Sequence, residues 1–218
     1  KYIKNRWKYK NNRTIDFGYI CLKLLIIMLN IVLFGKPGSG KGTQANFIKN
    51  MYNLIHISTG DVFRYNISNN TDLGKMAKSY MDKGDLVPDH VTIKMLEGEV
   101  NKNLNSNGFI FDGFPRTKNQ AQILDEFLKN KNLAISMTIA LELDDDVLIK
   151  RLIERGKESG RVDDQDKTKI QNRFVEYNNK TSVLIDYYSK QGKFHSVDGL
   201  GNINEITERI SNLININL

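Results

Sequence analysis

The stretch GKPGSGKGTQ (35–44) holds four glycines, two lysines and one proline within ten positions. It follows a continuous apolar run, LNIVLFG (29–35), which is typical of a strand buried on both faces of a parallel sheet. The spacing G-x4-G-K is that of a phosphate-binding loop, with Gly42 in place of the usual Ser or Thr and Thr43 one position later. Backbone N–H groups can converge on phosphate oxygens only where no Cβ obstructs them, and a following helix adds its positive dipole end. The stretch therefore predicts a phosphate site.

Further apolar runs alternate with amphipathic patterns along the rest of the chain. The runs are GFIFDG (108–113), SMTIALEL (136–143) and FHSVDG (194–199). The helical patterns occupy 42–51, 117–129, 145–155 and 202–213. Strands that alternate with helices predict a parallel sheet covered by helices on both faces, with ligands at the carboxyl ends of the strands. We therefore predict an α/β fold of the P-loop NTPase type.

Two stretches interrupt this alternation and are predicted to be mobile insertions. Residues 58–87 have a polar helical pattern, and residues 155–168, RGKESGRVDDQDKT, are charged and nearly free of apolar side chains. The expected organisation is one domain over 28–218. Its core consists of 28–57, 88–154 and 169–218, its substrate-binding insertion is 58–87, and its lid is 155–168.

The positive charge of the chain is concentrated in residues 1–27. The net charge is +7, but seven basic residues and one acidic residue in this segment account for +6, which leaves +1 for the remainder. We expect this segment to be an extension outside the fold and Met28 to be the natural start. The apolar run at 24–34 is shorter than the ~20 residues that a membrane span needs. With a single cysteine, Cys21, these features favour a cytoplasmic enzyme without membrane or disulfide.

Five segments together resemble the nucleoside monophosphate kinases, most closely the adenylate kinases with a short lid. Besides GKPGSGKGTQ they are HISTGDVFR (56–64), GDLVPDHV (84–91), FIFDGFPRTKNQ (109–120) and RLIERGKESGR (151–161). They occur in the family's order and span essentially all of residues 28–218. The resemblance implies reversible transfer of the terminal phosphoryl of MgATP to AMP, which gives two ADP, by a monomer that needs no covalent nucleophile.

The resemblance also implies the residues of the site. The transferring group is expected to meet Lys41, Arg116, Arg151, Arg161 and Arg173. ATP is expected at Gly38, Ser39, Gly40, Lys41, Gly42, Thr43, Arg155 and Gly201, with Arg155 against the adenine. AMP is expected at Thr59, Arg64, Asp85, Leu86, Val87, Gly113, Phe114, Pro115, Arg116, Gln120, Arg161 and Arg173. Arginine suits these roles because its planar fork holds two phosphate oxygens and stays ionised.

Three residues bear on the metal and on the identity of the base. Asp112 ends an apolar run beside the glycine loop, where a carboxylate can hold Mg2+ through water. Thr59 and Gln120 are typical of the adenylate kinases, and a glutamine amide can accept from an adenine amino group and donate to N1. Because residues 155–168 contain no cysteine, no structural zinc is expected in the lid.

Other readings of the sequence stay open. The same fold could use UMP, CMP or GMP as acceptor, which substrate profiling would decide. A nucleic-acid-binding module rests on the basic 1–27 segment alone, because the folded domain lacks the excess charge that a phosphate backbone attracts. A non-catalytic nucleotide-binding regulator is disfavoured by the presence of Lys41, Asp112 and the arginines.

Overall fold

The computed structural model describes residues 28–218, and the extension predicted for 1–27 lies outside the described residues. Five strands form one parallel sheet in the order β2-β3-β1-β4-β5. The strands are β1 (Leu29–Phe34), β2 (Ile55–Ser58), β3 (Gly108–Asp112), β4 (Met137–Glu142) and β5 (Phe194–Asp198). The order reverses at β1, so the loop that follows β1 opens at the carboxyl edge of the sheet where a crevice forms.

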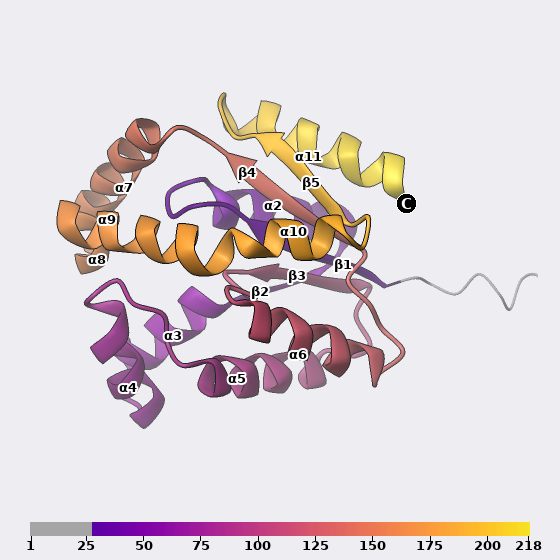
Figure 1. The fold of residues 1–218 in the computed structure, drawn as a ribbon, viewed down its shortest axis with the longest axis horizontal. Helices are drawn as coiled ribbons and strands as arrows, with labels where there is room; N and C mark the ends of the chain where they lie inside the picture. The colour runs from indigo at the N-terminus through magenta and orange to yellow at the C-terminus, as the bar shows by residue number, and fades with distance from the viewer. Residues whose placement is uncertain (1–27) are drawn as a thin grey trace, which may run out of the picture.

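Helices cover both faces of this sheet (Figure 1). They are α2 (Lys41–Tyr52), α3 (Thr59–Ser68), α4 (Asp72–Met81), α5 (Asp89–Lys102), α6 (Lys118–Lys129), α7 (Asp145–Ser159), α8 (Val162–Gln165), α9 (Lys167–Glu176), α10 (Val183–Ser189) and α11 (Ile203–Asn217). A five-residue π-helical turn, η1 (Tyr177–Thr181), joins α9 to α10. The predicted α/β architecture of the P-loop type is confirmed.

The alternation of side chains along β1 separates two apolar layers. Val32 and Phe34 face the layer that packs against α5, α6 and α10, while Ile31 and Leu33 face the layer against α2 and α11. Successive side chains of a strand point to opposite faces, so a strand buried on both sides reads as a continuous apolar run. At roughly 25 cal/mol per Å2 of apolar surface, these two layers supply most of the stabilisation of the core.

The two predicted insertions differ in how they are built. The insertion at 58–87 forms α3 and α4 around a small apolar cluster of its own, which contains Phe63, Ala77 and Val87. The lid predicted at 155–168 is mostly helical, since α7 continues to Ser159 and α8 follows. Its Asp164 is fully buried, contrary to the expectation that this charged stretch stays outside the core. The burial is possible because two arginines pair with this carboxylate, as described below.

One strand was not expected from the sequence. Residues 55–58, IHIS, form β2 at the edge of the sheet and pair with β3. The segment is short and contains a histidine, so it lacks the long apolar run of the other strands. Within residues 28–218, no helix is both long and apolar enough to cross a membrane.

Candidate active site

The glycine loop after β1 forms one wall of the site. Gly38 and Gly40 have φ of +87° and +95°, which L side chains rarely adopt. A Cβ at Gly35 would lie 2.5 Å from Ser39 Oγ and 2.8 Å from the Leu141 carbonyl oxygen, so only glycine fits there. Helix α2 begins at Lys41 with no side-chain cap and no acidic residue in its first turn. Its first N–H groups and its positive dipole end are therefore available to an anion.

Lys41 belongs to this wall, and its ammonium group is held by the loop itself. Its Nζ donates to the carbonyl oxygens of Gly35 at 2.7 Å and Lys36 at 3.1 Å. Burial lowers the pKa of Lys41 to about 8; Asp112 opposes this shift, and the positive charge of nearby arginines adds to it. An anion that replaced the two carbonyl partners would stabilise the charged form of this buried lysine.

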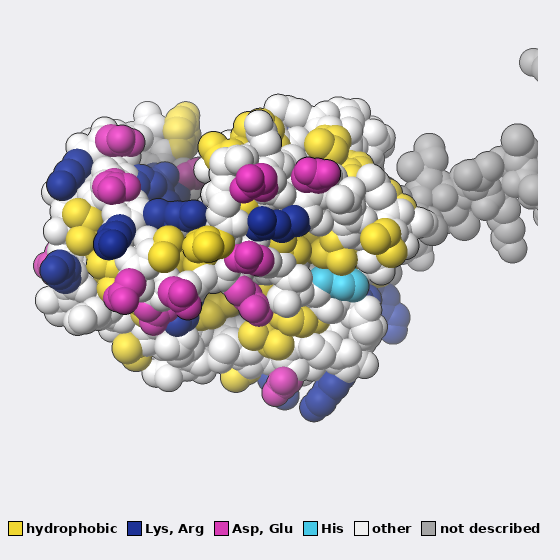
Figure 2. All heavy atoms as spheres, turned by 90° about the horizontal axis from the view of Figure 1, so that it is seen from above, with side chains coloured by type: hydrophobic (Ala, Val, Ile, Leu, Met, Phe, Trp, Pro, Cys, Tyr) yellow, Lys and Arg dark blue, Asp and Glu magenta, His cyan; other side chains and the backbone are white. Residues whose placement is uncertain are grey.

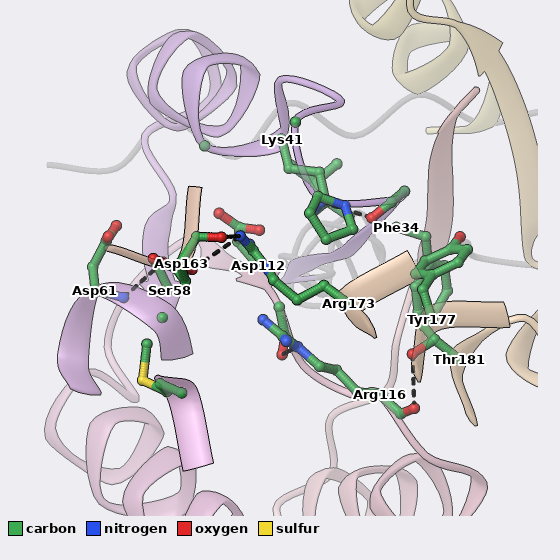
Figure 3. Close-up of a pocket in the computed structure, with 18 of the residues that line it drawn as sticks. Phe34, Lys41, Ser58, Asp61, Asp112, Arg116, Asp163, Arg173, Tyr177 and Thr181 are labelled. Atoms are coloured by element: carbon green, nitrogen blue, oxygen red, sulfur yellow. Dashed lines mark hydrogen bonds and ion pairs between the residues drawn. The ribbon is translucent and has the colours of Figure 1, made fainter. Parts of the chain in front are cut away.

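Arginines supply the rest of the positive charge of a cavity of about 400 Å3. The side chains that line this cavity include Arg64, Arg116, Arg155, Arg161 and Arg173. Figure 3 shows Lys41, Arg116 and Arg173 reaching it from different elements. Burial, followed by the positive charge of Arg173, lowers the pKa of Arg116 to about 10. So many cations around one space mark it as a site for a polyanion.

Four of these arginines are paired with carboxylates. Asp164 accepts from Arg155 Nε at 2.7 Å and from Arg173 Nη1 at 2.6 Å, and Asp163 lies 2.9 Å from the same Nη1. Burial alone would raise the pKa of Asp164, but the hydrogen bond and charge of Arg155, and then Arg173, bring it below its usual value.

Asp61 is the second carboxylate of this kind, and it stands near the first turn of α3. It lies 2.5 Å from Arg64 Nη2 and 3.7 Å from Arg161 Nη2. Arg161 belongs to the lid segment, so this carboxylate lies between the two insertions. The arginines of both insertions are thus held in place by internal acidic side chains.

A smaller pocket of about 50 Å3 adjoins the cavity. Its wall includes Thr59, Leu86, Val87, Gly113, Arg116 and Gln120. Thr59 Oγ1 donates to the Gly113 carbonyl at 2.9 Å, which joins α3 to the loop after β3. Arg116 lines both spaces, because its backbone N–H is held by Gln120 while its Nε donates to the Gly113 carbonyl at 2.7 Å. Seven of the twelve predicted acceptor residues, these six and Asp85, therefore line one pocket.

Asp112 stands at the bottom of the cavity, at the end of β3. It is 8% exposed, and its Oδ2 lies 3.4 Å from His56 Nε2. A Cβ on Gly42 would come within 3.5 Å of the same oxygen, so the carboxylate lies against the glycine loop. Within residues 28–218, no three His, Cys, Asp or Glu side chains cluster as a metal site. A single carboxylate beside the loop fits a cation that arrives with its phosphate ligands and keeps its water.

Four of the predicted residues do not line either space. Ser39 is buried within the loop, and the Phe114 side chain packs into the apolar core. Arg151 lies beside the β5–α11 connection, and Gly201 is part of that connection. Arg151 Nη2 is 3.5 Å from the Gly199 carbonyl, whereas Arg155 sits among the cavity charges. Arg155 was expected against the base and Arg151 on the transferring group, whereas in the structure Arg155 lines the cavity and Arg151 does not. The two residues are one helical turn apart on the same helix, so the sequence spacing alone does not indicate which of them faces the cavity.

The sequence reasoning missed the contribution of the π-helical turn η1. Tyr177 and Thr181 line the cavity, and Thr181 Oγ1 donates to the Arg116 carbonyl at 3.0 Å (Figure 3). Burial, and then the negative charge of Glu142, raises the pKa of Tyr177, while the Gly35 backbone opposes the shift. Wide turns of this kind often occur at functional sites. No motif in the sequence indicated this turn.

A buried strand that ends in a glycine loop, a lysine at a helix start and converging arginines define a P-loop phosphotransferase. A protein-family model described as "Adenylate kinase" matches residues 33–193. The chain is 65% identical over 188 residues to an adenylate kinase of Flavobacterium psychrophilum, which covers 86% of this chain and 99% of that protein. It is 49% identical over 183 residues to one of Bacteroides fragilis, which covers 84% and 96%. The chain belongs to the adenylate kinase family.

Proposed function

We propose that this protein transfers the terminal phosphoryl of MgATP to AMP, reversibly, to give two ADP. The observation that carries the proposal is that Arg116 lines both the large cavity at the glycine loop and the small pocket beside it. One arginine at the junction can hold an acceptor phosphate next to a donor phosphate. The family membership supports the same reaction.

The cavity residues have roles that follow from charge and position. Transfer through a loose transition state needs alignment and neutralisation of charge more than a covalent nucleophile. Lys41 and the N–H groups at the start of α2 hold the donor phosphates, and Arg64 and Arg116 hold the acceptor phosphate. Arg155, Arg161 and Arg173 close around the transferring group when they leave Asp61 and Asp164 for phosphate oxygens.

The donor base lies toward the β5–α11 connection in this proposal. Arg151 beside the Gly199 carbonyl, with Gly201 two residues further along, supports this placement. A guanidinium plane there can stack on a purine. Arg155 then takes the phosphate role first expected of Arg151, because it lies among the cavity charges.

The acceptor base occupies the small pocket, and its chemistry favours adenine. Gln120 presents an amide there, and a wrong base would leave its buried polar groups unpaired at a cost of about 1–3 kcal/mol each. Leu86 and Val87 supply the apolar walls. The 58–87 and 155–168 segments are proposed to close over both nucleotides, which keeps water away from the transferring phosphoryl.

Magnesium enters with ATP as part of the substrate, and it supplies positive charge between the phosphates when bound. Asp112 is the residue that would hold it, through water, since the carboxylate lies against Gly42 of the loop. The proposed function requires neither a zinc ion nor a nucleic-acid partner. On the face shown in Figure 2, Lys and Arg side chains are interspersed with Asp and Glu rather than gathered in a continuous basic stripe.

The test is an assay of the purified protein with MgATP and each of AMP, UMP, CMP and GMP, scored by the diphosphates produced. We expect AMP to be preferred by at least ~10-fold, the factor that one unpaired buried polar group supplies. Equal or faster turnover of UMP or CMP would assign the chain a different acceptor. Absence of turnover with all four would refute the proposal.

A further inference from the structure

Asp89, the first residue of α5, lines neither the cavity nor the small pocket, yet its carboxylate organises a wall of that pocket. It accepts three hydrogen bonds from the start of α6. Oδ1 accepts from Gln120 Nε2 at 2.7 Å, and Oδ2 accepts from Thr117 Oγ1 and Asn119 Nδ2, each at 2.9 Å. An ionised carboxylate can only accept, so each of these three partners must present a hydrogen to it.

Gln120 is 2% exposed, and both ends of its amide have a protein partner. Nε2 donates to Asp89 Oδ1, and Oε1 accepts from the Arg116 N–H at 2.7 Å. If the amide were turned over, its oxygen would face the carboxylate and its NH2 group would face the N–H. Both contacts would then be repulsive, so chemistry fixes which end of the amide is oxygen and which is nitrogen.

This arrangement leaves Gln120 with one free N–H and one free oxygen lone pair at the small pocket. A 6-aminopurine has an acceptor at N1 and a donor at the 6-amino group, and it can pair with both. A 6-oxopurine has a donor at N1 and an acceptor at O6, which is the reverse pattern. It would need the amide in the turned orientation that Asp89 and Arg116 oppose.

We propose that Asp89 determines the acceptor-base specificity of the enzyme by holding the Gln120 amide in the single orientation that accepts a 6-aminopurine and rejects a 6-oxopurine. The proposal rests on the proposed function, since it assumes that the small pocket binds the acceptor base. Asp89 touches no substrate and is a positioning residue. The Arg116 N–H is the second restraint on the same amide, so loss of Asp89 weakens the selection without abolishing it.

The experiment compares kcat/KM for AMP and IMP, with MgATP as donor, in Asp89→Leu and Asp89→Asn. These two acceptors differ only at positions 1 and 6 of the purine. Asp89→Leu removes the acceptor and frees the amide, and the AMP/IMP ratio is expected to fall by roughly 10-fold, the factor for one lost hydrogen bond to a charged group. Asp89→Asn can accept or donate, so the fall is expected to be smaller, roughly 3-fold.

The decisive result is an increase in kcat/KM for IMP itself. Structural damage to the site would instead lower kcat/KM for AMP and for IMP together. Asn119→Ala is the matched control. It removes one of the three hydrogen bonds to Asp89 but leaves the bond to Gln120, so the ratio should stay at the parent's value. Thermal unfolding of each variant shows which are folded.

The proposal is overturned if folded Asp89→Leu keeps the parent's ratio of kcat/KM for AMP to kcat/KM for IMP. It is also overturned if this ratio falls while kcat/KM for IMP does not increase. If Asp89→Leu does not fold, the same two outcomes in Asp89→Asn decide. Failure of the proposed function looks different: the parent enzyme would then turn over neither acceptor, or Gln120→Ala would leave the ratio unchanged.

Discussion

The glycine loop at 35–43 and the five arginines around it present positive charge to one cavity, but they are built differently. The loop is one continuous stretch in which backbone N–H groups and the start of α2 do the holding, with Lys41 tied to its own carbonyls. The arginines come from separate segments, and four of them are paired with Asp61, Asp163 or Asp164. The backbone of the loop is therefore already in place, and only Lys41 would exchange carbonyl partners for phosphate, whereas each paired arginine would have to leave a carboxylate.

The contrast is clearest at Arg116, because this arginine has no carboxylate partner among the ion pairs of residues 28–218 and is held through backbone contacts. We expect Arg116→Ala to lower kcat by about 10³-fold or more, as for arginines that act on a transferring phosphoryl. Burial already lowers the pKa of Arg116 to about 10, so its charge opposes folding and its removal should not unfold the protein. Steady-state kinetics and thermal unfolding check both parts; near-parental kcat would exclude Arg116 from the mechanism.

Lys41 offers a test of the loop by pH. Its pKa of about 8 means that the free enzyme loses this positive charge as pH rises above 8. Since only the charged form attracts phosphate, log kcat/KM for ATP should fall above pH 8, while kcat, measured with phosphates bound, should fall only at higher pH. Lys41→Met should lower kcat/KM by about 10²–10³-fold and remove this dependence. A profile that stays flat to pH 10 in the parent would contradict the assignment.

Asp164→Asn tests the paired arginines. Without nucleotides, the Asp164 carboxylate holds Arg155 and Arg173 and thereby stabilises the lid. The pKa of Asp164 is lowered in the folded protein, so its contribution to stability is present above its unfolded pKa of about 4 and is lost as pH falls through the folded value. We expect the variant to lose about 1.5–3 kcal/mol of unfolding free energy at pH 7. The difference between variant and parent should shrink below pH 4 in urea unfolding. A difference that stays constant down to pH 2 would mean that the lost stability does not come from the ionised form of the Asp164 carboxylate.

Thr181→Val should give the smallest effect, because it removes one hydroxyl that holds the Arg116 carbonyl. A net hydrogen bond is worth about 0.5–1.5 kcal/mol, so KM for AMP should rise by roughly 2- to 10-fold while KM for ATP is unchanged. Thr138→Val is the matched control. Its hydroxyl also donates to a backbone carbonyl, that of Lys193 at 3.2 Å, but Thr138 lies near the start of β4, away from the carboxyl edge of the sheet where the site is. Equal kinetic effects of the two variants would show that Thr181 has no special role.

The difference between the glycine loop and the arginines also explains how much of the structure the sequence could predict. The loop is local: a strand, glycines at fixed spacing and a helix start follow one another, so its structure could be read directly from residues 29–44. The parallel sheet followed from four apolar runs, but β2 did not, because IHIS at an edge carries too little apolar signal.

The rest of the site depends on contacts between distant segments, which single motifs do not reveal. Arg151 and Arg155 are one turn apart on α7, and only the packing of that helix decides which of them faces the cavity. Asp164 looked too polar for the interior, yet two arginines make its burial possible. Asp89 lies 31 positions from Gln120, and nothing in its local sequence points to a partner there.

The central claim is that one cavity holds two nucleotides end to end, between Lys41 and Arg116. Its most direct test is a crystal structure with a mimic in which two adenosines are joined by a chain of phosphates. We predict that Lys41 Nζ leaves the carbonyls of Gly35 and Lys36 and that both cations contact the phosphate chain, with one base in the pocket lined by Gln120. A complex in which either cation points away from the phosphates, or in which that pocket stays empty, would contradict the account.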